Sequence, residues 1–296
     1  MKIRGIITPV ITPMHEDESI NYEEFKNQIN RQIDAGVAGV FCLGTNGEFY
    51  AMTTDEKKKV IKTMVETAAH RVPVFAGTGC PGTKATIELS LYAKEAGADA
   101  LSIIAPYFAA ASQDEIYTHF KTIAEAVDMP IVLYNMPARA GNALQPATVA
   151  KLADIPNIVG VKDSSGNFDN MLQYIELTKD KDFFVLSGND ALILWNLQAG
   201  GVGGIAGCAN VYPYTLVSIF KLFEQGDFAG AKAVQDSIRP LRNVFKFGNP
   251  NTVVKKATKY LGYNVGECRA PFNQLSEAGM AALKKALDEG KEKGMK

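Results

Sequence analysis

The 296-residue sequence predicts an α/β fold, a (β/α)₈ TIM barrel with additional C-terminal helices. Short apolar runs alternate eight times with longer amphipathic stretches, and the runs lack polar alternation, as strands buried on both faces do. Three helix ends carry a similar segment, Ala-Gly followed by a small residue at 35–37, 96–98 and 199–201, where glycine suits the left-handed residue that stops a helix. Eight such units favour a closed barrel over an open doubly wound sheet, which is the main alternative.

The expected strands, in chain order, are Gly5–Ile11, Gly39–Leu43, Val72–Ala76, Ala100–Ala105, Ile131–Tyr134, Ile158–Lys162, Phe183–Ser187 and Gly203–Ala206. A helical pattern follows each strand, for example over Thr54–Ala69 and Gln113–Val127. From about residue 211 onward the sequence indicates further helices, and it contains no Ser/Gly-rich linker. We therefore expect a catalytic barrel over residues 1–225 and a helical extension packed on it over residues 226–296.

Composition narrows the classes of function and location. Hydrophobic residues make up 47% and charged residues 21%, and the formal net charge is −1, so there is no electrostatic reason to expect nucleic acid or an anionic membrane surface as a partner. No apolar stretch approaches the ~20 residues that span a bilayer. The four cysteines are far apart and form no CxxC pair. A cytoplasmic protein with reduced thiols and no membrane partner is expected.

The candidate nucleophile is Lys162. In such barrels the active site forms at the carboxyl ends of the strands, and Lys162 directly follows the apolar run Ile-Val-Gly-Val of the sixth strand. Burial lowers the pKa of a lysine, and a neutral amine is what attack on a ketone requires. The alternatives are a buried ion pair, with Glu48 or Asp163 as partner, or a phosphate ligand.

Tyr134 strengthens the catalytic interpretation. It ends the fifth strand, one βα repeat before Lys162, so the two side chains should be neighbours at the same barrel end. A phenol beside an amine can relay protons. The alternative is that Tyr134 only packs at the barrel rim as part of the core. The Gly44–Gly47 turn offers backbone N–H groups and the Thr45 hydroxyl to a carboxylate. Arg139 suits a second carboxylate, or else lies on the surface.

Other chemistries have less support. The three histidines do not cluster, so no metal site is expected. Gly77-Thr78-Gly79 lacks both the GK[ST] of a P-loop and the GxGxxG of a dinucleotide fold. The expected enzyme therefore needs no cofactor beyond a covalent lysine imine with its substrate. A phosphate-binding barrel is a further alternative, based on the glycine-rich stretch Gly200–Gly207.

Taken in order, the motifs LGTNGEF, YNMPARAG and VGVKDSSG resemble the dihydrodipicolinate synthase/N-acetylneuraminate lyase family of pyruvate-dependent class I aldolases. The resemblance covers essentially the whole chain. It implies that Lys162 forms the imine and that Tyr134 relays protons together with the catalytic hydroxyl of Thr45. The same resemblance implies that Thr45 and Asn46 form the turn that binds the pyruvate carboxylate. It also implies a homotetramer built from tight dimers, and pocket walls formed by the backbones at Gly188 and Ile205.

The features that distinguish subfamilies point in different directions. Arg139 matches the arginine with which the synthases hold their second substrate, whereas Asp163 is more similar to sugar-acid aldolases. Tyr107 and Phe108 fall at the expected subunit interface near the site, and Phe108 stands where the family carries a tyrosine. The resemblance thus implies a synthase that joins pyruvate to an aldehyde, aspartate semialdehyde. The alternatives are a retro-aldol lyase of a 2-keto-3-deoxy sugar acid and a non-catalytic paralogue that only binds a 2-oxo acid.

Overall fold

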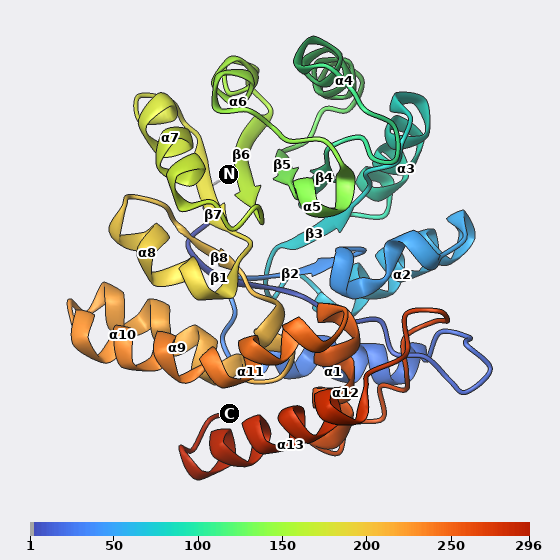
Figure 1. Ribbon diagram of the computed structural model, residues 1–296. Coiled ribbons are helices and arrows are strands. Elements are labelled where there is room, and N and C mark those ends of the chain that lie inside the picture. The colour runs from blue at the N-terminus through green and yellow to red at the C-terminus, as the bar shows by residue number, and fades with distance from the viewer. Residues whose placement is uncertain (1–2) are drawn as a thin grey trace.

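The computed structural model describes residues 3–296 and contains a closed barrel of eight parallel strands in sequence order (Figure 1). The predicted (β/α)₈ barrel is confirmed, and each strand begins and ends within two residues of its expected bounds. The strands are β1 (Gly5–Pro9), β2 (Gly39–Cys42), β3 (Val74–Gly77), β4 (Ala100–Ile104), β5 (Ile131–Asn135), β6 (Ile158–Asp163), β7 (Phe184–Ser187) and β8 (Gly203–Ile205).

Helices surround the barrel and connect its strands. They are α1 (Tyr22–Asp34), α2 (Thr54–Ala68), α3 (Thr83–Glu95), α4 (Gln113–Ala126), α5 (Pro137–Ala140), α6 (Pro146–Leu152), α7 (Phe168–Thr178), α8 (Ile193–Gln198) and α9 (Pro213–Glu224). Capping boxes begin two of them, at Thr53 with Glu56 and at Ser112 with Glu115. The predicted helix-ending glycines Gly36, Gly97 and Gly200 all have positive φ angles.

The apolar residues form two separate cores. A small core fills the barrel interior and includes Phe41, Phe75 and Phe184. The larger core lies between the strands and the surrounding helices, and it contains residues such as Ile158 and Val161 of β6. Each strand is therefore buried on both faces, which explains why its sequence shows no polar alternation.

A register shift in β6 decides which way Lys162 points. Ile131 of β5 pairs with Ile158, but the next residue, Val132, pairs with Gly160, so Val159 is an extra residue in β6. One extra residue in a strand moves every later side chain to the opposite face. Ile158 packs in the outer core, and without the shift Lys162 would share its face.

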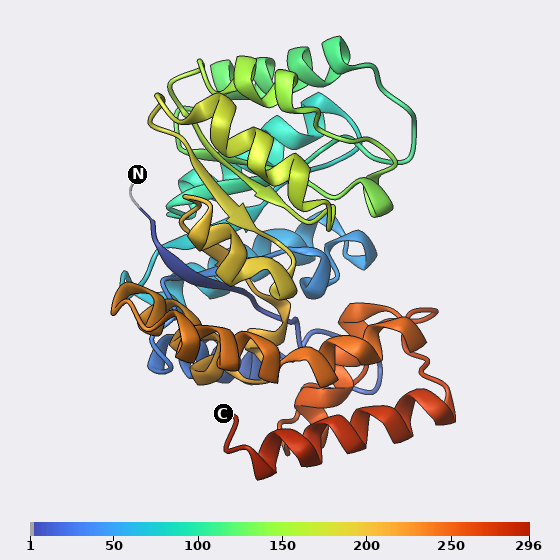
Figure 2. The ribbon, with the colours of Figure 1, turned by 60° about the vertical axis from the view of Figure 1, so that its left-hand side comes forward.

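The C-terminal part of the chain forms α10 (Phe228–Ser237), α11 (Arg239–Asn243), α12 (Pro250–Tyr260) and α13 (Glu277–Glu292). Figure 2 shows α11, α12 and α13 gathered on one side of the barrel. α12 packs against the short 3₁₀ turns η1 (Thr45–Gly47) and η4 (Gly207–Asn210), which follow β2 and β8. The additional helices are thus confirmed, while the domain division at residue 225 stays a prediction.

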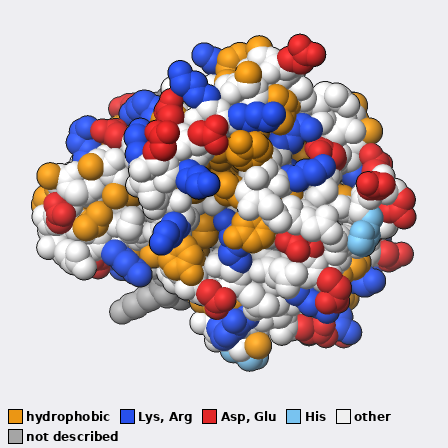
Figure 3. Space-filling view, turned by 90° about the horizontal axis from the view of Figure 1, so that it is seen from below, with side chains coloured by type: hydrophobic (Ala, Val, Ile, Leu, Met, Phe, Trp, Pro, Cys, Tyr) orange, Lys and Arg blue, Asp and Glu red, His pale blue; other side chains and the backbone are white. Residues whose placement is uncertain are grey.

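The surface carries mixed charge on the face drawn in Figure 3, where Lys and Arg side chains alternate with Asp and Glu side chains around scattered hydrophobic groups. Within residues 3–296, none of the helices is long and apolar enough to cross a membrane.

The barrel closes where β1 pairs with β8, and the first pair of this seam consists of two glycines. Gly203 pairs with Gly5, has a φ of +145°, and would place a Cβ atom 2.0 Å from the Gly5 carbonyl oxygen. Gly203→Ala should therefore lower the free energy of unfolding by at least about 3 kcal/mol in urea denaturation. Gly82→Ala is the control, because a Cβ at Gly82 meets nothing within 4 Å. Equal stability of the two variants would contradict this account of closure.

Candidate active site

A cavity of about 290 Å³ opens at the carboxyl ends of the strands. It is lined by Pro9, Thr45, Asn46, Tyr134, Met136, Arg139, Lys162, Ser164, Gly188, Asn189, Asp190, Ile205, Gly207, Arg242, Phe245, Pro250 and Val254. The structure therefore brings together every residue that the sequence predicted for catalysis or substrate binding. Tyr107 and Phe108, predicted for a subunit interface near the site, do not line the cavity of the single chain.

Lys162 lies at the end of β6, with only 4% of its surface exposed. Its Nζ atom sits 3.8 Å from the centroid of the Tyr134 ring and 5.1 Å from that of Phe41. Across residues 3–296, none of the ion pairs within 4.0 Å includes this amine. Lys162 is thus a buried amine that faces a cavity and has no ion-pair partner among the described residues.

The carboxylates that the sequence offered as ion-pair partners are engaged elsewhere. Glu48 accepts a hydrogen bond from Lys255 at 2.5 Å. Asp163 accepts hydrogen bonds from the side chains of Asn135, Ser165 and Asn170. The ion-pair interpretation of Lys162 is therefore wrong for both of its named partners.

Burial lowers the pKa of the Lys162 amine below its ordinary value, although the neighbouring Tyr134 and Asp190 act in the opposite direction. Burial acts to raise the pKa of Tyr134, but the charge of protonated Lys162 and hydrogen bonds with Thr45 and Ser164 outweigh it and lower that pKa. The ammonium and the phenol thus both release a proton more readily than usual. Such a pair suits proton exchange during attack by the amine.

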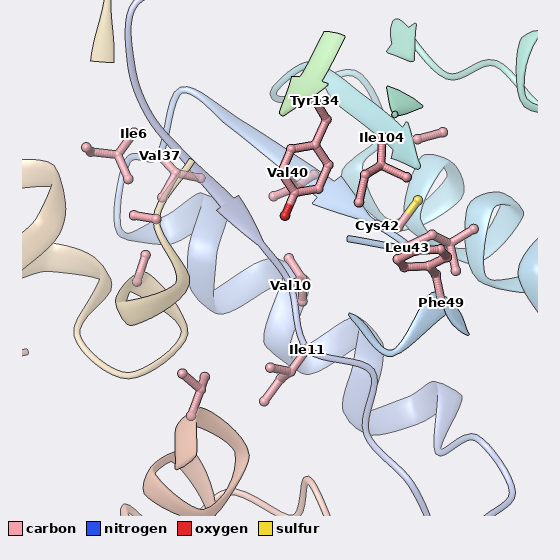
Figure 4. Packing of buried hydrophobic residues seen from close by; sticks show 14 of the residues in the cluster. Ile6, Val10, Ile11, Val37, Val40, Cys42, Leu43, Phe49, Ile104 and Tyr134 are labelled. Carbon is pink, nitrogen blue, oxygen red and sulfur yellow. The ribbon is translucent and has the colours of Figure 1, made fainter. Parts of the chain in front are cut away.

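Tyr134 and Lys162 are register partners on adjacent strands, as predicted from their spacing of one βα repeat. Figure 4 shows the Tyr134 hydroxyl pointing away from β5. This hydroxyl lies 3.2 Å from the Thr45 hydroxyl, and either atom could donate the hydrogen bond. The ring is buried, with 4% of the residue exposed. A connected pair of hydroxyls therefore borders the amine.

The turn after β2 has the geometry of an anion site. Gly47 and Glu48 donate their N–H groups to the carbonyls of Gly44 and Thr45, which closes the 3₁₀ turn η1. The backbone N–H groups of Thr45 and Asn46 have no acceptor in the described part of the chain. Both residues line the cavity that contains Lys162. Unpaired N–H groups at such a turn suit a carboxylate.

Arg139 supplies a second positive group at the cavity wall. It lies on α5, is solvent-exposed, and donates a hydrogen bond to the Asn249 side-chain carbonyl. Among residues 3–296 it pairs with no carboxylate within 4.0 Å. A guanidinium held only by a neutral amide remains available to an anionic substrate.

The cavity also contains residues that strand-end reasoning missed. Arg242 comes from α11 and donates to Asn189 at 2.6 Å and to buried Asp190 at 3.1 Å. Asp190 in turn accepts the N–H of Cys208 at 3.0 Å. Phe245, Pro250 and Val254 reach the cavity from the same C-terminal part of the chain. These residues do not directly follow a barrel strand, so strand-end reasoning gave no signal for this wall.

The predicted interface residues occupy the loop between β4 and α4. Tyr107 is half-buried and packs edge-on against Phe49, with 5.9 Å between ring centroids. Phe108 is fully exposed and has a φ of 81°. Neither side chain contributes a hydroxyl to the cavity of its own chain.

No cluster of three or more His, Cys, Asp or Glu side chains that could hold a metal ion occurs among residues 3–296. The groups that face the cavity are instead an amine, hydroxyls and anion-binding donors. Carbonyl addition by an amine, with proton transfer through Tyr134, is the chemistry that they support.

An enzyme of the class I aldolase type needs a reactive amine that faces a cavity at the rim of a barrel, and this fold places there a buried lysine whose pKa is lowered. The chain is an enzyme of this class, a carbon–carbon lyase or synthase. Its sequence matches the profile of the dihydrodipicolinate synthetase family over residues 2–290. The chain belongs to this family, and the resemblance found in its motifs is confirmed.

Individual relatives agree with this membership. A 4-hydroxy-tetrahydrodipicolinate synthase of Methanoculleus marisnigri is 41% identical, over 96% of this chain and 98% of its own length. A prophage protein of the same family from E. coli K12, solved in complex with pyruvate, is 33% identical with a TM-score of 0.93, covering 97% of this chain and 98% of that one. A monomeric dihydrodipicolinate synthase variant is 31% identical with a TM-score of 0.94, covering 98% of this chain and 97% of its own.

Two lysines buried to a similar extent should respond oppositely to removal of their charge. Lys162 has no ion-pair partner among residues 3–296, and its pKa in the folded protein lies below the ordinary 10.5. Between the folded and the unfolded pKa, the unfolded chain binds more protons than the folded one, so stability rises with pH in that range. Lys162→Met should therefore raise the free energy of unfolding at neutral pH, on the order of 1 kcal/mol. Lys255→Met, which leaves buried Glu48 without its partner, should lower it by about 3 kcal/mol.

Urea denaturation of both variants at neutral pH measures these changes. Lys256→Met, on the same helix as Lys255 but at a partly exposed ion pair, should change stability by less than about 1 kcal/mol. A large destabilisation by Lys162→Met would show that the amine has a stabilising partner after all.

Proposed function

We propose that the protein joins pyruvate to aspartate semialdehyde through a covalent imine on Lys162 and so acts as a 4-hydroxy-tetrahydrodipicolinate synthase, the activity after which relatives of about 40% identity are named. The observation that supports this most directly is the buried, unpaired Lys162 amine beside Tyr134 in the cavity. The pyruvate carboxylate binds the free N–H groups and hydroxyl of the Thr45–Asn46 turn. Gly188 and Ile205 form the adjacent walls.

The proposed reaction begins when neutral Lys162 attacks C2 of pyruvate and forms a carbinolamine. Tyr134 delivers a proton to the leaving hydroxyl, and water departs as the C=N bond forms. Loss of a proton from C3 then gives an enamine, with the iminium as the electron sink. The enamine carbon attacks the aldehyde carbon, and the new alkoxide takes a proton. The amino group of the former aldehyde then adds to C2 of the iminium and displaces the Lys162 nitrogen, which closes the ring and regenerates the amine.

Arg139 provides the argument for the aldehyde. Arg139 lies on the wall of the cavity that contains the Lys162 amine, and its guanidinium has no anionic partner among the described residues. A second substrate that carries a carboxylate could therefore pair with it. Fork-shaped pairing of a guanidinium with a carboxylate adds both affinity and orientation. Retro-aldol cleavage of a 2-keto-3-deoxy sugar acid uses the same imine steps, so only the second substrate separates the two activities.

We also propose that the protein is a cytoplasmic homotetramer, a dimer of dimers. Phe108 is fully exposed, and Leu172 and Leu177 of α7 are exposed by 39% and 47%, so apolar groups are open to solvent on two parts of the single chain. Contact with further copies of the chain would remove these apolar groups from water and would bring Tyr107 and Phe108 to a subunit interface. Sedimentation equilibrium tests the assembly, and a monomer at micromolar concentration would contradict it. Cell fractionation tests the location.

Reduction with borohydride in the presence of pyruvate should attach a stable adduct to the peptide that contains Lys162. Peptide mass mapping measures the adduct, and Lys162→Ala should show none while remaining folded. Lys162→Ala should also reduce turnover by several orders of magnitude, because the covalent step is lost. An unmodified Lys162 peptide in the native protein would overturn the proposed mechanism, and binding of pyruvate without turnover of any aldehyde would favour the non-catalytic alternative.

The aldehyde is identified by turnover with a panel of substrates. With pyruvate present, aspartate semialdehyde should be consumed faster than uncharged aldehydes of similar length. Arg139→Ala should raise the KM for aspartate semialdehyde roughly 10- to 100-fold and leave that for pyruvate unchanged. Arg239→Ala is the control, because Arg239 is exposed and pairs with Asp236 on the surface. Preferential cleavage of 2-keto-3-deoxy sugar acids would assign the lyase activity instead.

A further inference from the structure

We propose that the buried ion pair between Glu48 and Lys255 is a positioning device that holds the Thr45–Asn46 turn in the shape that binds the substrate carboxylate. The inference rests on the proposed function, because it assumes that pyruvate binds at this turn. It adds two residues that do not touch the substrate and that lie outside the cavity lining.

The pair is isolated from solvent and is held by further hydrogen bonds. The side chains of Lys255 and Glu48 are exposed by 1% and 0%, and the Lys255 Nζ atom lies 2.5 Å from Glu48 Oε1. The amine also donates to the Glu267 carbonyl at 2.9 Å, and Glu48 Oε2 accepts the Arg269 N–H at 2.8 Å. Glu48 is therefore bonded from two segments of the C-terminal extension.

Glu48 is the residue that ends the turn, and its backbone is left-handed. Its φ and ψ angles are 59° and 32°, and its N–H donates to the Thr45 carbonyl at 3.1 Å. A residue other than glycine in this conformation costs on the order of 1 kcal/mol, and it persists only where surrounding contacts hold it. The ion pair and the Arg269 bond fix the side chain, so they also fix the backbone that closes the turn.

The partner helix also forms part of the same cavity. α12 packs against η1, and Pro250 and Val254 on α12 line the cavity that Thr45 and Asn46 border. Lys255 follows Val254 directly, so a single helix both walls the site and anchors its anion-binding turn. The Thr12 hydroxyl adds a second anchor by donating to the Gly47 carbonyl at 2.9 Å.

Energetics favour a positioning role over a purely stabilising one. A buried ion pair often adds little net stability compared with an apolar pair of the same volume, because both charges lose their hydration. Its geometry, however, is strict, since short charge-assisted bonds tolerate little displacement. The expected effect of the pair is therefore on where the N–H groups of Thr45 and Asn46 point.

The test compares Lys255→Met with Lys256→Met in steady-state assays. Lys256 is the adjacent residue and also pairs with a glutamate, Glu267 at 2.8 Å, but that partner lies outside the turn. Lys255→Met should raise the KM for pyruvate at least about tenfold, with kcat within about threefold and the KM for the aldehyde unchanged. At saturating pyruvate, borohydride should still trap the Lys162 imine fully. Lys256→Met should match the native enzyme.

Glu48→Gln provides a second, shape-conserving variant in case Lys255→Met does not fold. It keeps an acceptor for the Arg269 N–H but removes the charge, so it should raise the KM for pyruvate in the same direction by a smaller factor. An unchanged KM for pyruvate in a folded Lys255→Met or Glu48→Gln, or a loss of kcat alone, would overturn the positioning role. Failure of the native enzyme to form the imine would instead overturn the proposed function itself.

Discussion

The chemistry proposed for this barrel depends on a buried amine that has no anionic partner within residues 3–296. The carboxylates near Lys162 are bonded to other groups. Glu48 pairs with Lys255, Asp190 pairs with Arg242, and Asp163 accepts hydrogen bonds from amide and hydroxyl donors. Inside a protein, where charges are weakly screened, a single free carboxylate beside Lys162 would hold the amine in its protonated form. The reactivity of the lysine is thus maintained largely by ion pairs and hydrogen bonds in which it takes no part.

The sequence predicts much of the barrel and the central site residues, for reasons that are physical and local. Strands buried on both faces must be apolar throughout, and reactive groups at their carboxyl ends must meet, so Lys162 and Tyr134 could be placed together. Local sequence patterns do not indicate that β6 contains an extra residue at Val159. Strict alternation from Ile158 would have turned Lys162 toward the helices, and only pairing with β5 shows the shift.

The C-terminal helices were harder to interpret from sequence. Arg242 and Lys255 lie on helices with other charged residues, a pattern typical of solvent-exposed faces. Their partners, Asp190 and Glu48, follow strands far away in the chain. No local pattern in the sequence indicates which Lys or Arg of these helices will pair with which carboxylate at a strand end, because the pairing depends on how the C-terminal extension packs on the barrel. The anion-binding turn and the loop after β7 are therefore both held by contacts that the sequence does not reveal.

The glycine seam between β1 and β8 has a consequence for synthesis of the protein. β1 is made first, yet its second neighbour, beginning at Gly203, leaves the ribosome only after the other seven strands. Until then a nascent chain can assemble only an open sheet with two unpaired edges, which are prone to pairing with other chains. The yield of folded protein should therefore depend on how well these edges are protected while the chain is being made.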